Sequence, residues 1–400
     1  MDQIIVVGGN FAGLTSALEV KRRLGNAYRV VLISKLPFFL FTPSLIWLPS
    51  GRRNLEDIIL PLEPLAAKAQ VEFVHAEATQ VLPKKRIVKC GDKEFNYDYL
   101  ILATGPEWIF DQIDGMRLDG NMSFIVTPDA ARAARNRWLK FAENPGPVVI
   151  GAMPGVQLVA QAYEVLFNVE KSCRDLGIRK KVELTFVTPE PFLGHLGMEG
   201  VTGSRHIFQN LLTKLGIRFI VNATVEKVAS DSIHLANGDS FPYSFSIFTP
   251  RFKGPSLIGR SAGLGIKDDF LPVNDGYQHI HYPNIFGVGA VAATPLDPGT
   301  PPAVALPKNG YAASMSAKTA AHNIVHLITG RGRFRLTPFT RLPELTVLDA
   351  ANREILGFSS TLLKPRSFSL MLENPVCDLG KLMVEKYFLW KIKQGYSRLP

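Results

Sequence analysis

The chain has few cysteines, and they are widely spaced. Its 400 residues contain Cys90, Cys173 and Cys377 and no other cysteine. Three scattered thiols cannot build a disulfide framework or a zinc site, so we expect no metal. We interpret each as a packed or incidental thiol: Cys90 in a strand of a β-meander, Cys173 on the surface of a basic helix and Cys377 in the C-terminal tail.

The sequence also lacks a long apolar run. No stretch reaches the ~18 apolar residues that a membrane-spanning helix needs, and Met1 is followed almost at once by a predicted strand. The sequence therefore predicts no signal peptide and no transmembrane helix, with a cytoplasmic setting as the default. The net charge of +10 suits an anionic membrane or a solvated basic surface. The basic clusters at 84–86, 179–181 and 331–333 are short and far apart, without aromatic stacking motifs near them, so nucleic acid is the least favoured partner.

The N-terminus has the pattern of a dinucleotide-binding βαβ unit. A buried apolar strand at 4–7 runs into Gly8-Gly9-Asn10-Phe11-Ala12-Gly13, and a helix follows to residue 24. Such a turn lets the backbone approach a pyrophosphate, and the helix start favours that anion through free N–H groups and the helix dipole. The middle glycine of the usual motif is replaced by Asn10.

Three later segments extend this pattern. The strand at 29–33 ends in Ser34-Lys35 instead of the usual ribose-binding acid, which leaves ribose binding unassigned. The strand at 100–102 ends in Ala103-Thr104-Gly105, and the stretch at 283–290 repeats this logic before a predicted helix at 310–327. Three glycine-tipped strands in this order resemble flavoproteins with two dinucleotide-binding domains, which implies FAD. The expected FAD contacts are Gly8, Gly9, Asn10, Phe11, Ala12, Gly13, Ser34, Lys35, Ala103, Thr104, Gly105, Gly289, Ala290, Lys308 and Asn309.

A second βαβ unit begins at residue 147 and lacks the features of a nucleotide site. Met153 and Val156 stand where the motif has glycines, and the strand at 182–187 ends in Thr188-Pro189 without an acid. A helix is expected at 156–167. We interpret this unit as a structural domain that does not hold NADH, and nicotinamide binding there is the alternative.

These elements predict an α/β protein with two Rossmann-like dinucleotide-binding domains, of which the FAD-binding one is discontinuous. We assign residues 1–125, including a β-meander at 71–102, to the first part of the FAD-binding domain. The second Rossmann-like domain takes 145–254, and the chain returns to the FAD-binding domain at 255–333. Residues 334–400 form a basic, aromatic C-terminal region.

Four segments spread over nearly the whole chain resemble the sulfide:quinone oxidoreductases and the flavoprotein subunit of flavocytochrome c sulfide dehydrogenases. They are residues 33–47, 186–197, 306–311 and 385–391. The resemblance implies a peripheral membrane enzyme that carries two electrons from sulfide through a cysteine pair or trisulfide to FAD and then to a quinone. The family's cysteine positions fall near Val126, Leu158 and Thr346, and none of these residues is cysteine. The resemblance therefore still implies FAD and a quinone, and the electron donor stays open.

Three residues are candidates for catalysis. Gln157, Gln161 and Glu164 are spaced to share one helix face, and the resemblance places Glu164 near the site, where quinone reduction takes up protons; the alternative is a solvated helix face. His195 matches a family histidine suited to proton relay, or is structural. Lys308 precedes a helix start whose N–H groups can stabilise negative charge on a reduced flavin, or is a surface lysine.

The segment from Asp378 to Gln394 predicts a basic helix rich in aromatic residues. Such a helix can lie in the membrane interface with its lysines on anionic headgroups, and the resemblance favours this on the cytoplasmic side. Docking onto the protein core or onto a second copy in a homo-oligomer is the alternative. A quinone is then expected beneath the tail, and the candidate stacking residues are Phe39, Phe41, Phe358, Tyr387 and Phe388.

The predicted function is therefore that of an FAD-dependent oxidoreductase that passes two electrons from a small donor to a membrane quinone. Two alternatives stay open: an NADH:quinone oxidoreductase of the same architecture, and a non-catalytic flavin-binding or electron-transfer partner. No cysteine stands where the family's thioether forms, so we expect noncovalent FAD.

Overall fold

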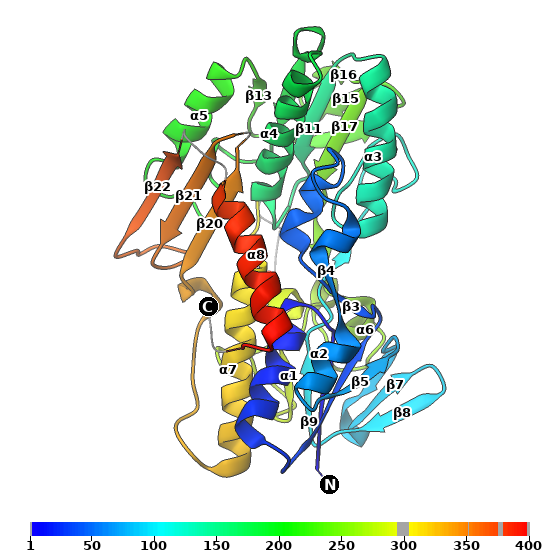
Figure 1. Ribbon diagram of the computed structural model, residues 1–400, viewed down its shortest axis with the longest axis vertical. Helices are drawn as coiled ribbons and strands as arrows, with labels where there is room; N and C mark the ends of the chain where they lie inside the picture. Colours follow the sequence, from blue (N-terminus) through cyan, green and yellow to red (C-terminus); the bar gives the residue numbers. More distant parts are fainter. Residues whose placement is uncertain (1, 294–303, 351, 375–378, 398–400) are drawn as a thin grey trace.

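The computed structural model describes residues 2–293, 304–350, 352–374 and 379–397. Its first sheet is parallel, with strand order β19-β9-β1-β2-β5. The strands are β1 (Gln3–Val7), β2 (Arg29–Ser34), β5 (Glu72–His75), β9 (Tyr99–Leu102) and β19 (Ile285–Gly287). From Ile4 to Val7, β1 is buried at every position, as expected for a parallel strand covered on both faces. The helices α1 (Phe11–Leu24) and α7 (Gly310–Thr329) lie side by side against this sheet (Figure 1).

Smaller elements surround the first sheet. They are the hairpin of β3 (Phe38–Leu40) and β4 (Ile59–Pro61), the helices α2 (Leu62–Lys68) and α6 (Ser256–Gly259), and the antiparallel meander of β6 (Gln80–Leu82), β7 (Ile87–Cys90) and β8 (Lys93–Asn96). The pair β10 (Glu107–Trp108) and β18 (Phe252–Lys253) lies where the chain leaves and re-enters this part of the molecule.

The second sheet is also parallel, with strand order β13-β12-β11-β17. Its strands are β11 (Val148–Ala152), β12 (Leu184–Val187), β13 (Arg218–Ile220) and β17 (Phe245–Thr249), accompanied by α3 (Pro128–Glu143), α4 (Val159–Asp175) and α5 (Ser204–Lys214). An antiparallel sheet of β14 (Val225–Val228), β15 (Ser232–Leu235) and β16 (Ser240–Pro242) lies beside it.

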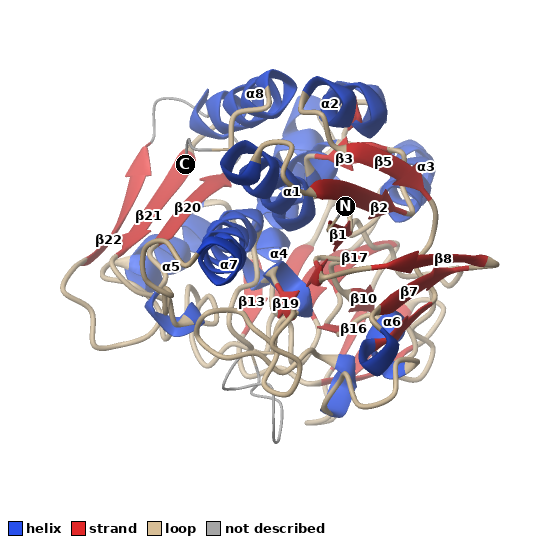
Figure 2. Ribbon diagram, turned by 90° about the horizontal axis from the view of Figure 1, so that it is seen from below, coloured by secondary structure: helices blue, strands red, loops and turns tan. Residues whose placement is uncertain are grey.

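The C-terminal region adds a third layer. Three antiparallel strands, β20 (Glu344–Asp349), β21 (Glu354–Ser359) and β22 (Ser369–Asn374), form a sheet, and α8 (Leu379–Gln394) starts over one end of it. Figure 2 shows α8 beside α2, away from the edge strand β22. Within the described ranges, no helix combines the length and apolar character that a membrane crossing requires.

The predicted first strand, the predicted helix at 310–327 and the placing of Cys90 in a meander strand are confirmed. The prediction for the first helix of the second unit is wrong. Instead of 156–167 it runs from Val159 to Asp175, because Val156 is held in a loop by pairing with Val304. The longer helix brings Cys173 onto its inner face with no exposed surface, so the predicted surface position is also wrong. Cys377 lies outside the described residues.

Candidate active site

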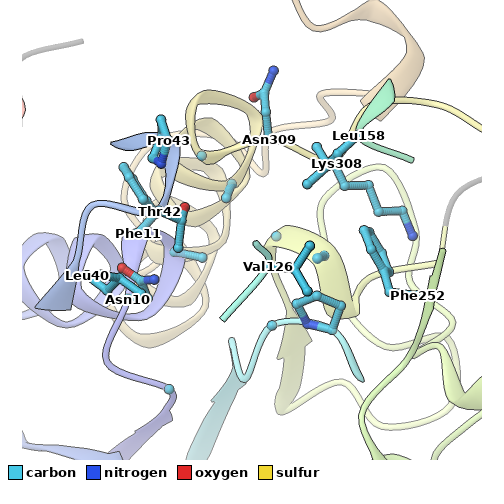
Figure 3. A pocket seen from close by; sticks show the side chains of 18 of the residues that line it. Asn10, Phe11, Leu40, Thr42, Pro43, Val126, Leu158, Phe252, Lys308 and Asn309 are labelled. Carbon is cyan, nitrogen blue, oxygen red and sulfur yellow. The ribbon is translucent and has the colours of Figure 1, made fainter. Parts of the chain in front are cut away.

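A cavity of about 960 Å³ lies at the carboxyl ends of β1 and β9, where open α/β sheets bind ligands. Its walls come from the β1–α1 turn, the loop before α4, the start of α7, strand β20 and the inner face of α8. Figure 3 shows Asn10 and Phe11 from the first sheet's side of the cavity, with Val126, Leu158 and Lys308 on the other side. One cavity therefore joins both βαβ units to the C-terminal region.

The β1–α1 turn requires glycine. Gly8 has a φ of +112°, and a Cβ there would lie 2.2 Å from the carbonyl oxygen of Ala103. A Cβ on Gly13 would lie 1.7 Å from the carbonyl oxygen of Gly8, so the helix can start only against a glycine. No side chain caps α1, and its first turn has no acidic residue. The first-turn N–H groups are therefore available to an anion.

Every predicted cofactor contact except Gly13 lines the cavity. Two of them, Asn10 and Thr104, have buried side-chain oxygens without a hydrogen-bond partner in the described residues. At the exposed end of the cavity, Lys35 pairs with Glu77 at 3.0 Å, and both line the wall. Sequence reasoning missed Glu77; the signal was an acid just after β5, the strand next to β2.

The three positions expected near the family's cysteines come together without a thiol. Val126, Leu158 and Thr346 arrive from separate segments and all line the cavity. Cys90 and Cys173 do not line it, and burial raises the pKa of both thiols, that of Cys173 to about 12. Neither described cysteine can therefore replace the missing thiols.

Glu164 lies inside the protein and not on a solvated face. Its Oε1 receives the Lys381 ammonium at 2.5 Å and the backbone N–H of Asp349 at 3.0 Å. The side chains of Glu164 and Lys381 are 9% and 4% exposed, and both line the cavity. Burial raises the pKa of Glu164, while Lys381 opposes that rise. Gln157 lies before the helix and bonds both backbone groups of Phe252, so the expected shared face does not form.

The aromatic residues divide into two groups. Phe41 and Phe388 line the cavity with Phe11, each ring centroid 5.9 Å from the other two, and Tyr387 adjoins Phe388. Phe39 is fully buried behind Phe11 and does not line the cavity. Phe358 does not reach it either: its side chain is 41% exposed on the outer face of β21.

His195 and Lys308 lie in different surroundings. His195 is half-buried beside Phe192 and outside the cavity lining, and burial lowers its pKa. Lys308 lines the cavity and is buried, so it is not a surface lysine. Its ammonium donates to the carbonyl of Ala292 and lies 3.9 Å from the centroid of the Phe270 ring.

Helix α8 docks onto the core. Lys381, Glu385 and Lys391 are at most 3% exposed, and Glu385 accepts hydrogen bonds from Ser44 and Arg53. Burial lowers the pKa of Lys391 to about 8. The prediction that all lysines of this helix face headgroups is therefore wrong for Lys381 and Lys391, which the sequence pattern could not distinguish from Lys386 and Lys393.

The turn of the second unit is filled by protein. Met153 is fully buried, and Val156 pairs with Val304, with Ala305 donating its N–H to Val156 at 2.9 Å. Past the end of β12, Glu190 is also buried; its carboxylate accepts hydrogen bonds from Tyr163, Thr188 and the N–H of Leu196. The carboxylate of Glu190, the acid that follows the end of β12, is therefore already hydrogen-bonded to other groups of the protein.

Comparisons with known proteins agree with this architecture. The model of the pyridine nucleotide-disulphide oxidoreductase family matches residues 2–322. The sulfide-quinone reductase of Aquifex aeolicus is 34% identical over 98% of this chain and 91% of its own length. The chain belongs to the pyridine nucleotide-disulphide oxidoreductase family. It is an FAD-dependent oxidoreductase of the sulfide-quinone reductase type, which confirms the predicted family, cofactor and α/β fold.

The match to the crystal structure of the Aquifex aeolicus sulfide:quinone oxidoreductase covers all of this chain and 93% of the Aquifex aeolicus chain, with a TM-score of 0.93 at 32% identity. A type II NADH:quinone oxidoreductase from Staphylococcus aureus is 21% identical over 82% of this chain and 83% of its own length. The NDH2 of Plasmodium falciparum shares the fold, with a TM-score of 0.76 at 16% identity over 99% of this chain and 96% of its own.

The residues present fit FAD. The glycine turn and the uncapped start of α1 suit the pyrophosphate. The side-chain oxygens of Asn10 and Thr104, which have no partner in the described residues, are available to bind the cofactor. At the other end, Asn309 caps α7 by accepting the N–H of Ala312 at 2.9 Å, so this helix start also faces the cavity. The cavity wall therefore contains two helix starts, those of α1 and α7.

Proposed function

We propose that this chain is a peripheral membrane enzyme that passes two electrons from a small reductant through FAD to a quinone on the cytoplasmic side of the cell membrane. The observation that carries the proposal is that the cavity with the dinucleotide turn continues to an aromatic wall of Phe11, Phe41 and Phe388. Flat aromatic rings suit a quinone ring. The sulfide-quinone reductase relative supports the acceptor by its name.

FAD, when bound, supplies the two-electron carrier between donor and quinone. Residues of the β1–α1 turn hold its pyrophosphate, and the start of α7 stabilises negative charge near its ring. With no cysteine in the described cavity wall, we propose that FAD is held noncovalently.

A proton source lies beside the aromatic wall. Lys381, Val384 and Phe388 are spaced i, i+3 and i+7 on α8, so they share one face, and all three line the cavity. Quinone reduction consumes two protons, and the ammonium of Lys381, held by Glu164, is placed to donate one to a quinone oxygen. Glu164 then orients Lys381.

The membrane-facing surface that we propose combines a sheet face and one side of α8. The outer face of the C-terminal sheet has two cross-strand rows of apolar residues: Leu345, Phe358 and Leu370, then Val347, Leu356 and Leu372. On α8, Leu379, Met383 and Trp390 are exposed at helical spacing, with Lys386 between them. An apolar face rimmed by lysines suits a lipid interface.

The same surface borders the cavity. Leu345 and Val347 belong to the apolar face of the sheet and also line the cavity, next to Tyr387 and Val384 of α8. A quinone leaving the lipid phase would therefore enter between β20 and α8, directly opposite the aromatic wall.

The donor must react without a protein thiol. Sulfide is the donor named for the relative, and NADH for more distant ones. The filled turn of the second unit argues against NADH, because Val156, Val304 and Met153 occupy the space where a nucleotide would approach the backbone.

The test is anaerobic mixing of the purified FAD-loaded protein with sulfide and, separately, with NADH, followed by decylubiquinone. We expect quinone to reoxidise the flavin after any donor that bleaches it. In a separate assay we expect the protein to float with phosphatidylglycerol vesicles and the double variant Met383→Glu/Trp390→Glu not to float. A flavin that quinone fails to reoxidise would contradict the enzyme proposal. Equal flotation of that variant would contradict the membrane surface alone.

A further inference from the structure

Glu344 is a second buried carboxyl in the cavity wall, at the first position of β20. It is 7% exposed. Its Oε1 accepts hydrogen bonds from Asn309 at 2.7 Å and from Thr346 at 3.3 Å, whereas its Oε2 is buried without a partner in the described residues. A buried carboxyl oxygen that lines a cavity and lacks a partner calls for a ligand or a proton.

Its surroundings differ from those of Glu164. Glu164 lies beside Asp349 at the far end of β20, five residues along, which corresponds to roughly 16 Å of strand. Glu164 is paired with the Lys381 cation, while the hydrogen-bond partners of Glu344 among the described residues, Asn309 and Thr346, are neutral. The two carboxyls thus belong to opposite ends of the cavity wall.

The groups that face Glu344 come from β20 and the start of α7. Asn309 donates its side-chain N–H to Glu344 while its oxygen caps α7, so the amide cannot turn over without losing the cap. Tyr311 is the titratable neighbour; burial and then Glu344 raise its pKa. Lys308 directs its ammonium to Ala292 and the Phe270 ring. Burial raises the pKa of Glu344 to about 7, with the two hydrogen bonds opposing.

Glu344 also contacts one of the three positions where the resemblance places a cysteine. It is two residues before Thr346 on the same face of β20, and its carboxylate accepts a hydrogen bond from that hydroxyl. Val126 and Leu158, the other two positions, line the same cavity. An acid–base group therefore lines the cavity in which a capturing thiol is absent from the described wall.

We propose that Glu344 is the catalytic base for the donor, and that the donor is a small neutral reductant that loses two ionisable hydrogens on two-electron oxidation, as a dithiol does when its intramolecular disulfide forms. This inference rests on the proposed function. With FAD bound as the two-electron acceptor, one of the two protons would go to FAD with the electron pair, and the carboxylate of Glu344 would take the other as the S–S bond closes. The ionised Glu344 disfavours an anionic donor, which is why a neutral one fits.

The variant is Glu344→Gln, with Glu164→Gln as the comparison and the exposed Glu226→Gln as the matched control. The first readout needs no donor: the absorption spectrum of bound FAD is followed from pH 5.5 to 9. We expect a spectral transition near pH 7 in the wild type and in Glu226→Gln and Glu164→Gln, and none in Glu344→Gln. The same transition in Glu344→Gln would overturn the proposal.

The second readout is the rate of flavin reduction by two probes. Dithiothreitol must lose protons as it is oxidised, whereas N-benzyl-1,4-dihydronicotinamide gives only a hydride. At pH 8 we expect Glu344→Gln to slow reduction by dithiothreitol on the order of 10²-fold and to change the other rate less than about twofold. In the wild type the dithiothreitol rate rises with pH through about 7, as Glu344 loses its proton.

Equal slowing with both probes would overturn the proposal, because it would mean that Glu344 only positions FAD. If neither probe bleaches the flavin, the spectral titration decides. Reoxidation of dithionite-reduced protein by decylubiquinone is measured on the same variants. Failure of that step in the wild type would contradict the proposed function while leaving the result on Glu344 intact.

Discussion

The two βαβ units of this protein share a topology and differ in what occupies their turns. In the first, Gly8 and Gly13 allow the tight turn, and the start of α1 lines the cavity without a side-chain cap. In the second, the corresponding turn packs Met153 into the core and pairs Val156 with Val304. The same fold therefore carries one open turn and one filled turn, and the difference lies in a few turn residues.

The second unit has nevertheless kept a role in the site. The loop that follows its first strand brings Leu158 to the cavity, and α4 brings Glu164 to Lys381. This unit therefore supplies part of the cavity wall.

The largest effect is expected from closing the open turn. Gly8→Ala places a Cβ 2.2 Å from the Ala103 carbonyl oxygen at a φ of +112°, so we expect loss of nearly all bound FAD. The measurement is the ratio of flavin to protein absorbance after purification. Gly91→Ala is the matched control, since Gly91 also has positive φ (+60°) but open space around it. Full FAD occupancy in Gly8→Ala would show that the turn does not hold the cofactor.

The next effect concerns the contact between the second unit and α8. Lys381→Met leaves Glu164 buried without its cation, which costs about 3–5 kcal/mol of unfolding free energy. Lys386→Met removes an exposed lysine of the same helix and should cost less than about 0.5 kcal/mol. Urea unfolding followed by tryptophan fluorescence compares the two. The double variant Glu164→Gln/Lys381→Met should recover most of the loss; no recovery would mean that the pair is not coupled.

A smaller effect is expected on the pH dependence of stability, to which two buried acids contribute in opposite directions: Glu19 in the first unit and Glu190 in the second. Burial raises the pKa of Glu190 to about 7, so its share of stability is complete below the unfolded pKa of about 4.3 and is lost as pH rises through 7. Burial also opposes ionisation of Glu19, but hydrogen bonds from Arg22, Ser397 and Arg23 lower its pKa to about 2. Its share is present above about 4.3 and is lost as pH falls toward 2.

Urea unfolding at several pH values therefore distinguishes the units. Between pH 5 and 7 we expect the unfolding free energy of Glu190→Gln to fall less with pH than that of the wild type, by on the order of 1–3 kcal/mol. Glu19→Gln should leave that interval unchanged and flatten the curve below about pH 4. Identical slopes for Glu190→Gln and the wild type would show that Glu190 is not held as the structure indicates.

The smallest effect is expected from reopening the second turn by one residue. Met153→Gly should not create NADH binding, because Val156 and Val304 still pair across the turn. The measurement is the thermal midpoint with and without 1 mM NADH, and we expect a shift of less than about 1 °C in both proteins. A clear rise in the wild type would show that the second turn opens and admits the nucleotide.

Local patterns were sufficient for the first unit. The run of apolar residues before Gly8 and the glycine spacing predicted strand, turn and helix, because these depend on neighbours within a few residues. Glu344 and Lys381 were missed as partners of the site, and Phe11 was predicted as an FAD contact but not as part of the aromatic wall, since these roles arise from contacts over tens to hundreds of residues.

The errors have the same origin. The displaced start of α4 follows Val156, which pairs with Val304, a residue distant in the sequence, and Cys173 is buried because α4 turns that side toward the core. Phe358 belongs to an apolar sheet face and not to the cavity, a distinction that depends on which face of β21 meets the core.

The most direct test of the account is to reduce the bound FAD with dithionite under anaerobic conditions and to mix it separately with decylubiquinone and with NAD⁺. The account predicts rapid reoxidation by the quinone, slowed in Lys381→Met, and none by NAD⁺. Reoxidation by NAD⁺, or none by the quinone, would contradict the assignment of an open first unit and a filled second one.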